Sequence, residues 1–380
     1  MTSYDVAVIG LGAMGSAALY AAAGRGLHVI GIDRYEPAHR RSSSFGESRV
    51  IRLAYFEHPS YVPLLVEAYR RWRALETSSG EQVMTITGIV EAGYPGSPSV
   101  EGSLRSSLEH GLAHERMTAA EVASRFPAFS LPSDWEVIFQ PDAGALLPEK
   151  AIRLFVSGAK ALGGEVRVST RVIAIEPRGD RTRIVMESGE RVDAGSAIVS
   201  TGAWMGDLLP DVAAKLDLTR QPLMWFEPRD PVLVKPDRMP IFFFQTAQDK
   251  IYGLPNLCGT GVKVASHLSC GDLASAEAAR AEVSLEEVRH LSEMLQHYVP
   301  AAAGPLVNTS VCLYTRSPDE HFVIGLHPQA PQIVIASPCS GHGFKFSSVI
   351  GEILTDLAID RHTKWPIDLF KPERVLDSET

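Results

Sequence analysis

The chain has 380 residues, of which 45% are hydrophobic and 21% are charged. This length and composition indicate a folded protein of about two domains and exclude disordered and fibrous classes. The formal net charge is -9 at pH 7, so the chain lacks the basic excess expected of a nucleic-acid-binding protein.

Apolar runs are short and cysteines are few. No run approaches the roughly 20 apolar residues that span a bilayer, and the first residues do not resemble a secretory signal. The four cysteines, Cys258, Cys270, Cys312 and Cys339, form no CxxC pair, which favours a reducing compartment. We therefore expect a cytoplasmic protein without a membrane-spanning helix or a metal site.

The amino terminus carries a dinucleotide-binding pattern. Residues 6–9 predict a strand, the sequence Gly10-Leu11-Gly12-Ala13-Met14-Gly15 follows it, and residues 16–23 predict a helix. Gly10 permits a tight turn, Gly12 lets a pyrophosphate approach the backbone, and Gly15 lets the helix pack closely on the strand. The helix N-terminus then offers unpaired N–H groups to the anion.

A second predicted strand, residues 27–32, ends at Asp33. An acid about 20 residues past the glycines is placed to accept hydrogen bonds from a ribose hydroxyl. An acid rather than an arginine disfavours the 2′-phosphate of NADP. The glycine motif alone leaves NAD and FAD open.

Later segments favour FAD. A helix is predicted over 149–162, strands over 165–168 and 171–175, a hairpin over 183–187 and 191–193, and a strand over 197–200 before a turn at 201–204. This order resembles the FAD-binding domain of two-domain flavoprotein oxidoreductases. An NAD dehydrogenase would more often continue with regular βα repeats. The resemblance places Val172 near the adenine, and Gly202 and Trp204 beside the cofactor.

The segment 41–55 combines small polar residues, including Ser42 and Ser43, with Arg49 and Arg52. Arginines spaced by three either share one face of a helix or line a loop that bends around an anion. A solvated basic turn is the alternative. A helix over 61–76 is predicted next.

The carboxyl-terminal part repeats the combination of a glycine loop and a helix start. A predicted strand over 333–336 leads into Ser340-Gly341-His342-Gly343-Phe344-Lys345, after which a helix is expected. Backbone N–H groups and the cation of Lys345 suit an electron-rich ligand, such as the pyrimidine end of a reduced flavin.

Nearly the whole chain resembles the family of monomeric sarcosine oxidase and N-methyl-L-tryptophan oxidase, flavoenzymes that oxidise N-methyl amino acids. The resemblance rests on the motifs at 10–15, 46–52, 252–255, 261–263, 311–315 and 340–348. It implies an α/β fold, in which a doubly wound, Rossmann-like FAD domain is interleaved with a mixed-sheet substrate domain. We expect the FAD domain at 1–80, 145–215 and 316–380, the substrate domain at 81–144 and 216–315, and a monomer.

The resemblance also implies roles for residues. Cys312 matches the cysteine that joins the flavin 8α carbon through a thioether, whereas a buried, inert thiol is the alternative; the other three cysteines receive no role. The expected FAD-binding residues are Gly10, Gly12, Ala13, Met14, Gly15, Asp33, Arg34, Ser42, Ser43, Arg49, Val172, Gly202, Trp204, Cys312, Gly341, Gly343, Phe344 and Lys345.

The expected catalytic residues include four cations. Arg52 and Lys345 match the pair that holds the substrate carboxylate, Lys263 matches a lysine that promotes reaction with dioxygen, and Arg49 matches a cation beside the isoalloxazine ring. The residues that match those surrounding the substrate are Tyr252, His267 and Tyr314.

Two departures from the family pattern bear on the substrate. Ser44 and Phe45 replace a histidine pair, with Glu47 as the following acid, and residues 242–244 are all phenylalanine. The changes weaken the case for sarcosine itself. A bulkier secondary amine, N-methyltryptophan-like, cyclic or sugar-conjugated, is equally consistent.

The predicted activity is an FAD-dependent oxidase of N-methyl amino acids. Hydride transfer to flavin N5 yields an imine that water hydrolyses, and dioxygen is reduced to hydrogen peroxide. Two alternatives are an FAD-dependent dehydrogenase that uses a quinone or carrier protein, and a nucleotide-binding module without catalysis.

Overall fold

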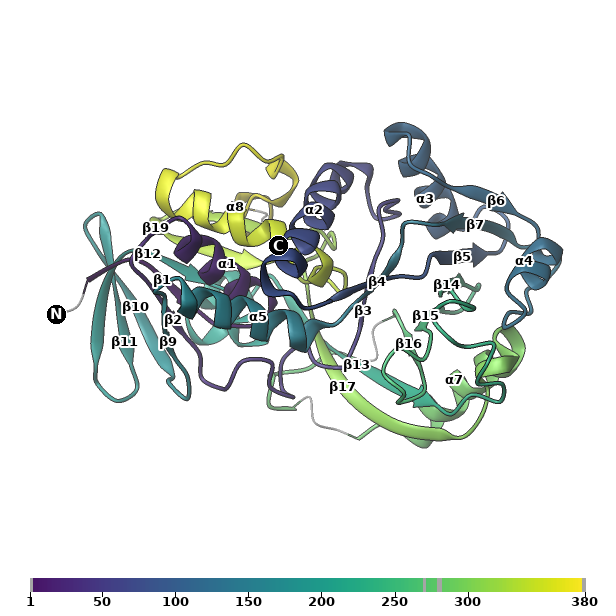
Figure 1. Cartoon of the computed structure of the whole chain (residues 1–380). Coiled ribbons are helices and arrows are strands. Elements are labelled where there is room, and N and C mark those ends of the chain that lie inside the picture. The colour runs from purple at the N-terminus through teal and green to yellow at the C-terminus, as the bar shows by residue number, and fades with distance from the viewer. Residues whose placement is uncertain (1–2, 269–270, 279–281, 378–380) are drawn as a thin grey trace.

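The computed structural model describes residues 3–268, 271–278 and 282–377. Within these ranges the strands form two eight-stranded sheets and one three-stranded sheet. Figure 1 shows the first sheet with its helices on one side of the molecule and the second sheet on the other.

The first sheet has a parallel centre with strand order β9-β2-β1-β12-β19. The bounds are β1 Ser3–Ile9, β2 Val29–Ile32, β9 Glu165–Arg167, β12 Arg191–Val199 and β19 Ala330–Ser337. Antiparallel strands extend it: β10 Val172–Arg178, β11 Arg181–Met186 and β18 Val323–His327. The order reverses between β1 and β12, which is where doubly wound sheets bind ligands. The predicted fold class is confirmed.

Three helices pack against this sheet, namely α1 Ala13–Gly24, α5 Pro148–Ala161 and α8 Ser347–Asp360. Helix α1 contacts both α5 and α8 (Figure 1). Helix α1 is rich in alanine, and because these side chains are small and apolar the helix can be buried on nearly every side. Close approach of α1 and α8 depends on Gly351, because a Cβ there would lie 2.6 Å from the backbone of Ala17.

The second sheet has the order β17-β13-β16-β15-β14-β5-β7-β6. Two long antiparallel strands, β13 Asp217–Phe226 and β17 Leu306–Arg316, form one edge. The remaining strands are β5 Ile89–Gly93, β6 Glu115–Met117, β7 Glu136–Gln140, β14 Ile241–Gln245, β15 Lys250–Leu254 and β16 Val262–Ser266.

A small sheet of β3 Arg49–Ile51, β8 Gly144–Leu146 and β4 Met84–Ile86 completes the strands. The longer helices not yet named are α2 Val62–Ser79, α3 Pro98–His110, α4 Ala119–Arg125 and α7 Leu285–Tyr298, and two short ones are α6 Pro210–Ala213 and α9 Glu373–Leu376. Helices α4 and α7 each begin with a capping box, at Thr118 and Ser284. None of the helices in the described ranges has both the length and the apolarity to cross a bilayer.

Replacing Gly351 by alanine tests the contact between α1 and α8. The added methyl group would force the helices apart, and overpacking of this kind costs about 1–3 kcal/mol of unfolding free energy. Alanine at Gly24, where a Cβ meets nothing within 4 Å, is the matched control and should cause no loss. Urea unfolding measures both; equal stability of the Gly351→Ala protein and the wild type would contradict the packing argument.

Candidate active site

One large cavity collects residues from both eight-stranded sheets and from the loops between them. Of the residues predicted from sequence, only Gly15 and Lys263 do not line it. Those that do are Gly10, Gly12, Ala13, Met14, Asp33, Arg34, Ser42, Ser43, Arg49, Arg52, Val172, Gly202, Trp204, Tyr252, His267, Cys312, Tyr314, Gly341, Gly343, Phe344 and Lys345.

The glycine loop between β1 and α1 forms one end of the cavity. Gly10 has φ +88°, and a Cβ there would lie 2.6 Å from the carbonyl oxygen of Ser200. A Cβ at Gly15 would lie 1.8 Å from the oxygen of Gly10, which explains the close packing of α1. At Gly12 a Cβ would meet nothing within 4 Å. The loop therefore leaves open space in front of an α1 N-terminus that has no acidic residue and no side-chain cap.

Asp33 follows β2 and is held beside that loop. Its Oδ2 accepts a hydrogen bond from the backbone N–H of Leu11 at 2.6 Å, and its Oδ1 accepts one from Tyr35 at 2.7 Å. Burial raises the pKa of its carboxyl group. The carboxylate is thus fixed at the cavity wall.

Arg49 lies on strand β3, and Arg52 follows that strand. Of the alternatives for the two arginines, a shared helical face is therefore wrong. Arg49 instead donates to the carbonyl oxygens of Ser43 at 2.8 Å and Phe45 at 2.6 Å. The guanidinium groups of Arg49 and Arg52 therefore have different partners: backbone carbonyl oxygens for Arg49, and carboxylates for Arg52.

Lys263 lies on β16 and contacts the loop 46–48. Its Nζ donates to the carbonyl oxygens of Gly46 at 2.8 Å and Ser48 at 2.7 Å. Burial, and then the charge of Arg49, hold its pKa well below the usual range. The lysine supports the loop rather than lining the cavity.

Two acidic residues complete the support of this loop. Glu149 accepts hydrogen bonds from the backbone N–H groups of Gly46 at 2.8 Å and Glu47 at 3.0 Å. Glu47, with φ +68°, accepts from Trp225 Nε1 at 3.0 Å and Thr260 Oγ1 at 2.7 Å. The loop 46–48, which directly precedes Arg49, is therefore held in place by side chains from several other elements.

Arg52 is 4% exposed, so the solvated basic turn is also wrong. Its Nη2 lies 2.9 Å from Glu57 Oε2 and its Nε lies 3.2 Å from Glu91 Oε1. Burial alone would raise the pKa of Glu57, but Arg52, His342 and Lys345 lower it to about 2. For Glu91 burial prevails and raises the pKa to about 7.

Lys345 reaches the cavity from the turn before α8. Its Nζ donates to the carbonyl oxygen of His342 at 2.8 Å and to Tyr55 Oη at 3.3 Å. Tyr55 Oη lies 2.7 Å from His342 Nδ1, and His342 Nε2 lies 3.0 Å from the carbonyl oxygen of Glu320. Burial, followed by the charge of Arg52, lowers the pKa of Lys345 to about 7.

Aromatic rings form the wall near Arg52. The ring of Phe56 lies 4.9 Å from that of Phe243, and Phe243 lies 5.7 Å from His267, centre to centre. The ring centres of Tyr314 and Tyr252 are 6.0 and 6.4 Å from that of His267. Burial lowers the pKa of His267 to about 3, so its imidazole is neutral near pH 7. The wall is broad, aromatic and uncharged.

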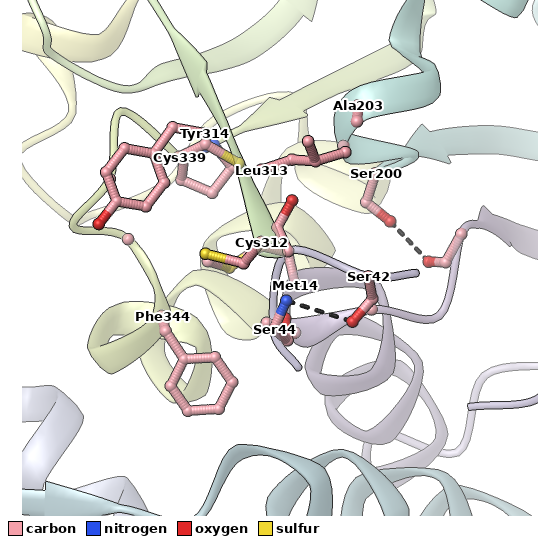
Figure 2. A pocket seen from close by; sticks show the side chains of 18 of the residues that line it. Met14, Ser42, Ser44, Ser200, Ala203, Cys312, Leu313, Tyr314, Cys339 and Phe344 are labelled. Atoms are coloured by element: carbon pink, nitrogen blue, oxygen red, sulfur yellow. Dashed lines mark hydrogen bonds between the residues drawn. The ribbon is translucent and has the colours of Figure 1, made fainter. Parts of the chain in front are cut away.

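Cys312 projects from β17 into the cavity. Figure 2 shows it between the segment with Ser42 and Ser44 and the turn with Phe344. The thiol is buried, and burial raises its pKa although Arg49 and Lys263 act in the opposite direction. Cys339 also lines the cavity, Cys258 is exposed, and Cys270 lies outside the described residues.

Sequence reasoning missed several residues of this site, among them Tyr55, Phe56, Glu57 and Glu91. One signal was present for Glu91, since it is an acid within the otherwise uncharged strand 89–93, which is buried throughout. Glu57 gave no such signal, because acids are common in loops.

Comparisons with known proteins show the family of the chain. Residues 5–357 match the family model described as FAD dependent oxidoreductase. Monomeric sarcosine oxidase of Streptomyces avermitilis is 37% identical over 98% of both chains. N-methyl-L-tryptophan oxidase of Yersinia pestis is 30% identical over 96% of this chain and 97% of its own.

Solved structures share the fold. The amino acid oxidase NikD, in its open form, has a TM-score of 0.87 and 24% identity over 98% of both chains. Fructosyl amine oxidoreductase of Aspergillus fumigatus has a TM-score of 0.80 and 19% identity, over all of this chain and 92% of its own. From the family match over most of its length, together with the sarcosine oxidase relative, we conclude that the chain belongs to the FAD-dependent oxidoreductases.

Proposed function

We propose that the protein is an FAD-dependent oxidase of N-methyl and related secondary-amine amino acids that reduces dioxygen to hydrogen peroxide. The observation that carries the proposal is the meeting of two buried cations, Arg52 and Lys345, in the same cavity as the glycine loop. Such a pair suits a carboxylate beside a dinucleotide cofactor. The named relatives, sarcosine oxidase and N-methyl-L-tryptophan oxidase, support this substrate class.

The residues present fit FAD. The space before Gly12 and the α1 N-terminus suit the pyrophosphate, and Asp33 suits a ribose hydroxyl. We assign cofactor binding to the part built by residues 1–80, 145–215 and 316–380, and the substrate surface mainly to 81–144 and 216–315. The first sheet draws its strands from 3–32, 165–199 and 323–337, which supports this division.

FAD, when bound, accepts a hydride from the C–H bond next to the amine and passes the electrons to dioxygen. The protein residues bind and orient the substrate. Arg52 and Lys345 hold its carboxylate, and the wall of Phe56, Phe243 and His267 accommodates its side chain. An aromatic and uncharged wall favours a substrate larger than sarcosine. Because His267 is neutral, it places no positive charge beside the amine.

The substrate class is tested by adding N-methyl and cyclic amino acids to the flavin-loaded protein without oxygen. At least one, with an apolar or aromatic side chain, should bleach the flavin and release hydrogen peroxide in air. Lys345→Met should raise the KM for that substrate about 10- to 100-fold, because a hydrogen bond to a charged group is lost.

The exposed Lys364 supplies the control, and Lys364→Met should leave KM unchanged. Bleaching without peroxide would replace the oxidase by a dehydrogenase that uses another acceptor. Absence of bleaching with every amine tested would reject the proposed activity.

Covalent attachment at Cys312 is a separate proposal, supported by the position of its thiol in the cavity. The denatured, acid-precipitated wild type should retain yellow flavin, and Cys312→Ser should release it. Cys339→Ser, in the other thiol that lines the cavity, is the control and should retain it. Acid-stable colour in the Cys312→Ser protein would exclude this attachment site.

We also propose that Lys263 promotes the reaction with dioxygen. Its Nζ donates to two carbonyl oxygens of the loop 46–48, and these acceptors favour the charged form against the burial that lowers its pKa. Lys263→Met should slow reoxidation by dioxygen on the order of 10²-fold, as expected for removal of one preorganised cation, with much less effect on anaerobic reduction. Stopped-flow absorbance measures both half-reactions, and equal losses in the two would refute the role.

A further inference from the structure

Glu91 is a carboxylate with no exposed surface, and it contacts Arg52, which lines the cavity. Its Oε2 accepts a hydrogen bond from Gln140 Nε2 at 2.8 Å, and Gln140 Oε1 accepts one from the backbone N–H of Ala54 at 3.1 Å. Its Oε1 makes no hydrogen bond and faces Arg52 Nε at 3.2 Å. Charge compensation of Glu91 thus depends on Arg52.

The surroundings of Glu91 contain few other charges. Glu57 opposes its ionisation, and Lys345 interacts with it favourably from the turn before α8. The hydroxyl of Ser103 faces it from α3. The residues paired with it on the neighbouring strands, Phe243 on β14 and Ile138 on β7, carry no charge.

A bound substrate carboxylate adds a negative charge to this group of buried charges. Arg52 and Lys345 then share three anions, namely Glu57, Glu91 and the ligand. An unpaired negative charge in a buried site is costly unless it is neutralised by a proton. Glu57 is the weaker candidate for protonation, since its side chain is 12% exposed and Nη2 of Arg52 contacts both of its oxygens, at 2.9 and 3.1 Å.

We propose that Glu91 takes up a proton from solvent when a substrate carboxylate binds to Arg52 and Lys345, and so acts as a positioning residue that frees Arg52 for the ligand. The step forms one O–H bond on Glu91 and transfers no electrons. This inference rests on the proposed function, because it requires a carboxylate ligand in the cavity.

The direction of the pH effect follows from the free protein. Burial raises the pKa of Glu91 to about 7, so above pH 7 the group is mostly ionised before the ligand binds. A second anion nearby raises that pKa further. Binding above pH 7 therefore consumes a proton, and affinity should fall by up to about tenfold per pH unit.

The flavin-loaded protein can be titrated with benzoate, a carboxylate that has no oxidisable amine, and with uncharged benzamide. Calorimetry at pH 8 in phosphate and in Tris, which differ in heat of ionisation, measures the protons taken up. Wild type should take up protons with benzoate and none with benzamide, and Lys345, whose pKa is also about 7, contributes part of this uptake. Glu91→Gln should take up fewer protons than wild type, by up to one, and its benzoate Kd should depend less steeply on pH between 7 and 9.

Glu101→Gln, which makes the same change at an exposed residue of α3, is the control and should behave as wild type. Glu91→Leu is a second neutral variant in case the glutamine variant does not fold. Proton uptake in both Glu91 variants equal to that of wild type would assign all of it to Lys345 and overturn the inference. Absence of uptake in wild type that binds benzoate would overturn it as well.

Failure of the proposed function gives a different pattern. If wild type with bound flavin binds no benzoate and is bleached by no amino acid, the carboxylate site itself is wrong and the role of Glu91 falls with it. If wild type is bleached by a secondary-amine amino acid while proton uptake does not depend on Glu91, only the present inference is rejected.

Discussion

The arrangement of the site depends on the need to give partners to buried cations. Arg52, Lys263 and Lys345 are each at most 5% exposed, and a buried charge is tolerated only when it is paired or hydrogen-bonded. Their partners come from distant parts of the chain: carboxylates for Arg52, carbonyl oxygens of residues 46 and 48 for Lys263, and residues 55 and 342 for Lys345. Segments far apart in the sequence therefore lie together at the site, because one segment carries the cation and another carries the groups that pair with it.

The two large sheets contribute differently to this convergence. The first provides the crossover point between β1 and β12 and the close packing of α1, which together leave space before Gly12. The second provides side chains on β14, β15 and β17 that form the far wall. A ligand between them therefore meets backbone N–H groups at one end and aromatic rings at the other, so polar recognition and apolar recognition are separated in space.

Local patterns predicted the fold well, and long-range contacts limited prediction of the site. The glycines at 10–15, Asp33 and the capping boxes at Thr118 and Ser284 act within a few residues of themselves, so their consequences can be derived from sequence. The pairing of β3 with β8 joins residues far apart, and it decided that Arg49 lies on a strand rather than a helix. Residue type also does not indicate burial, so neither the hydrogen bonds of Lys263 to the loop 46–48 nor the ion pair of Glu91 with Arg52 could be predicted.

The hydrogen bonds around Lys345 have a fixed direction. The carbonyl oxygen of Glu320 can only accept, so His342 must carry its proton on Nε2. Burial lowers the pKa of His342 to about 4, and the Nδ1 of the neutral ring can then only accept from the Tyr55 hydroxyl. Tyr55 Oη in turn accepts from Lys345. A single backbone carbonyl thereby fixes where His342 and Tyr55 carry their protons, and Lys345, which lines the cavity, keeps one N–H outside its two hydrogen bonds.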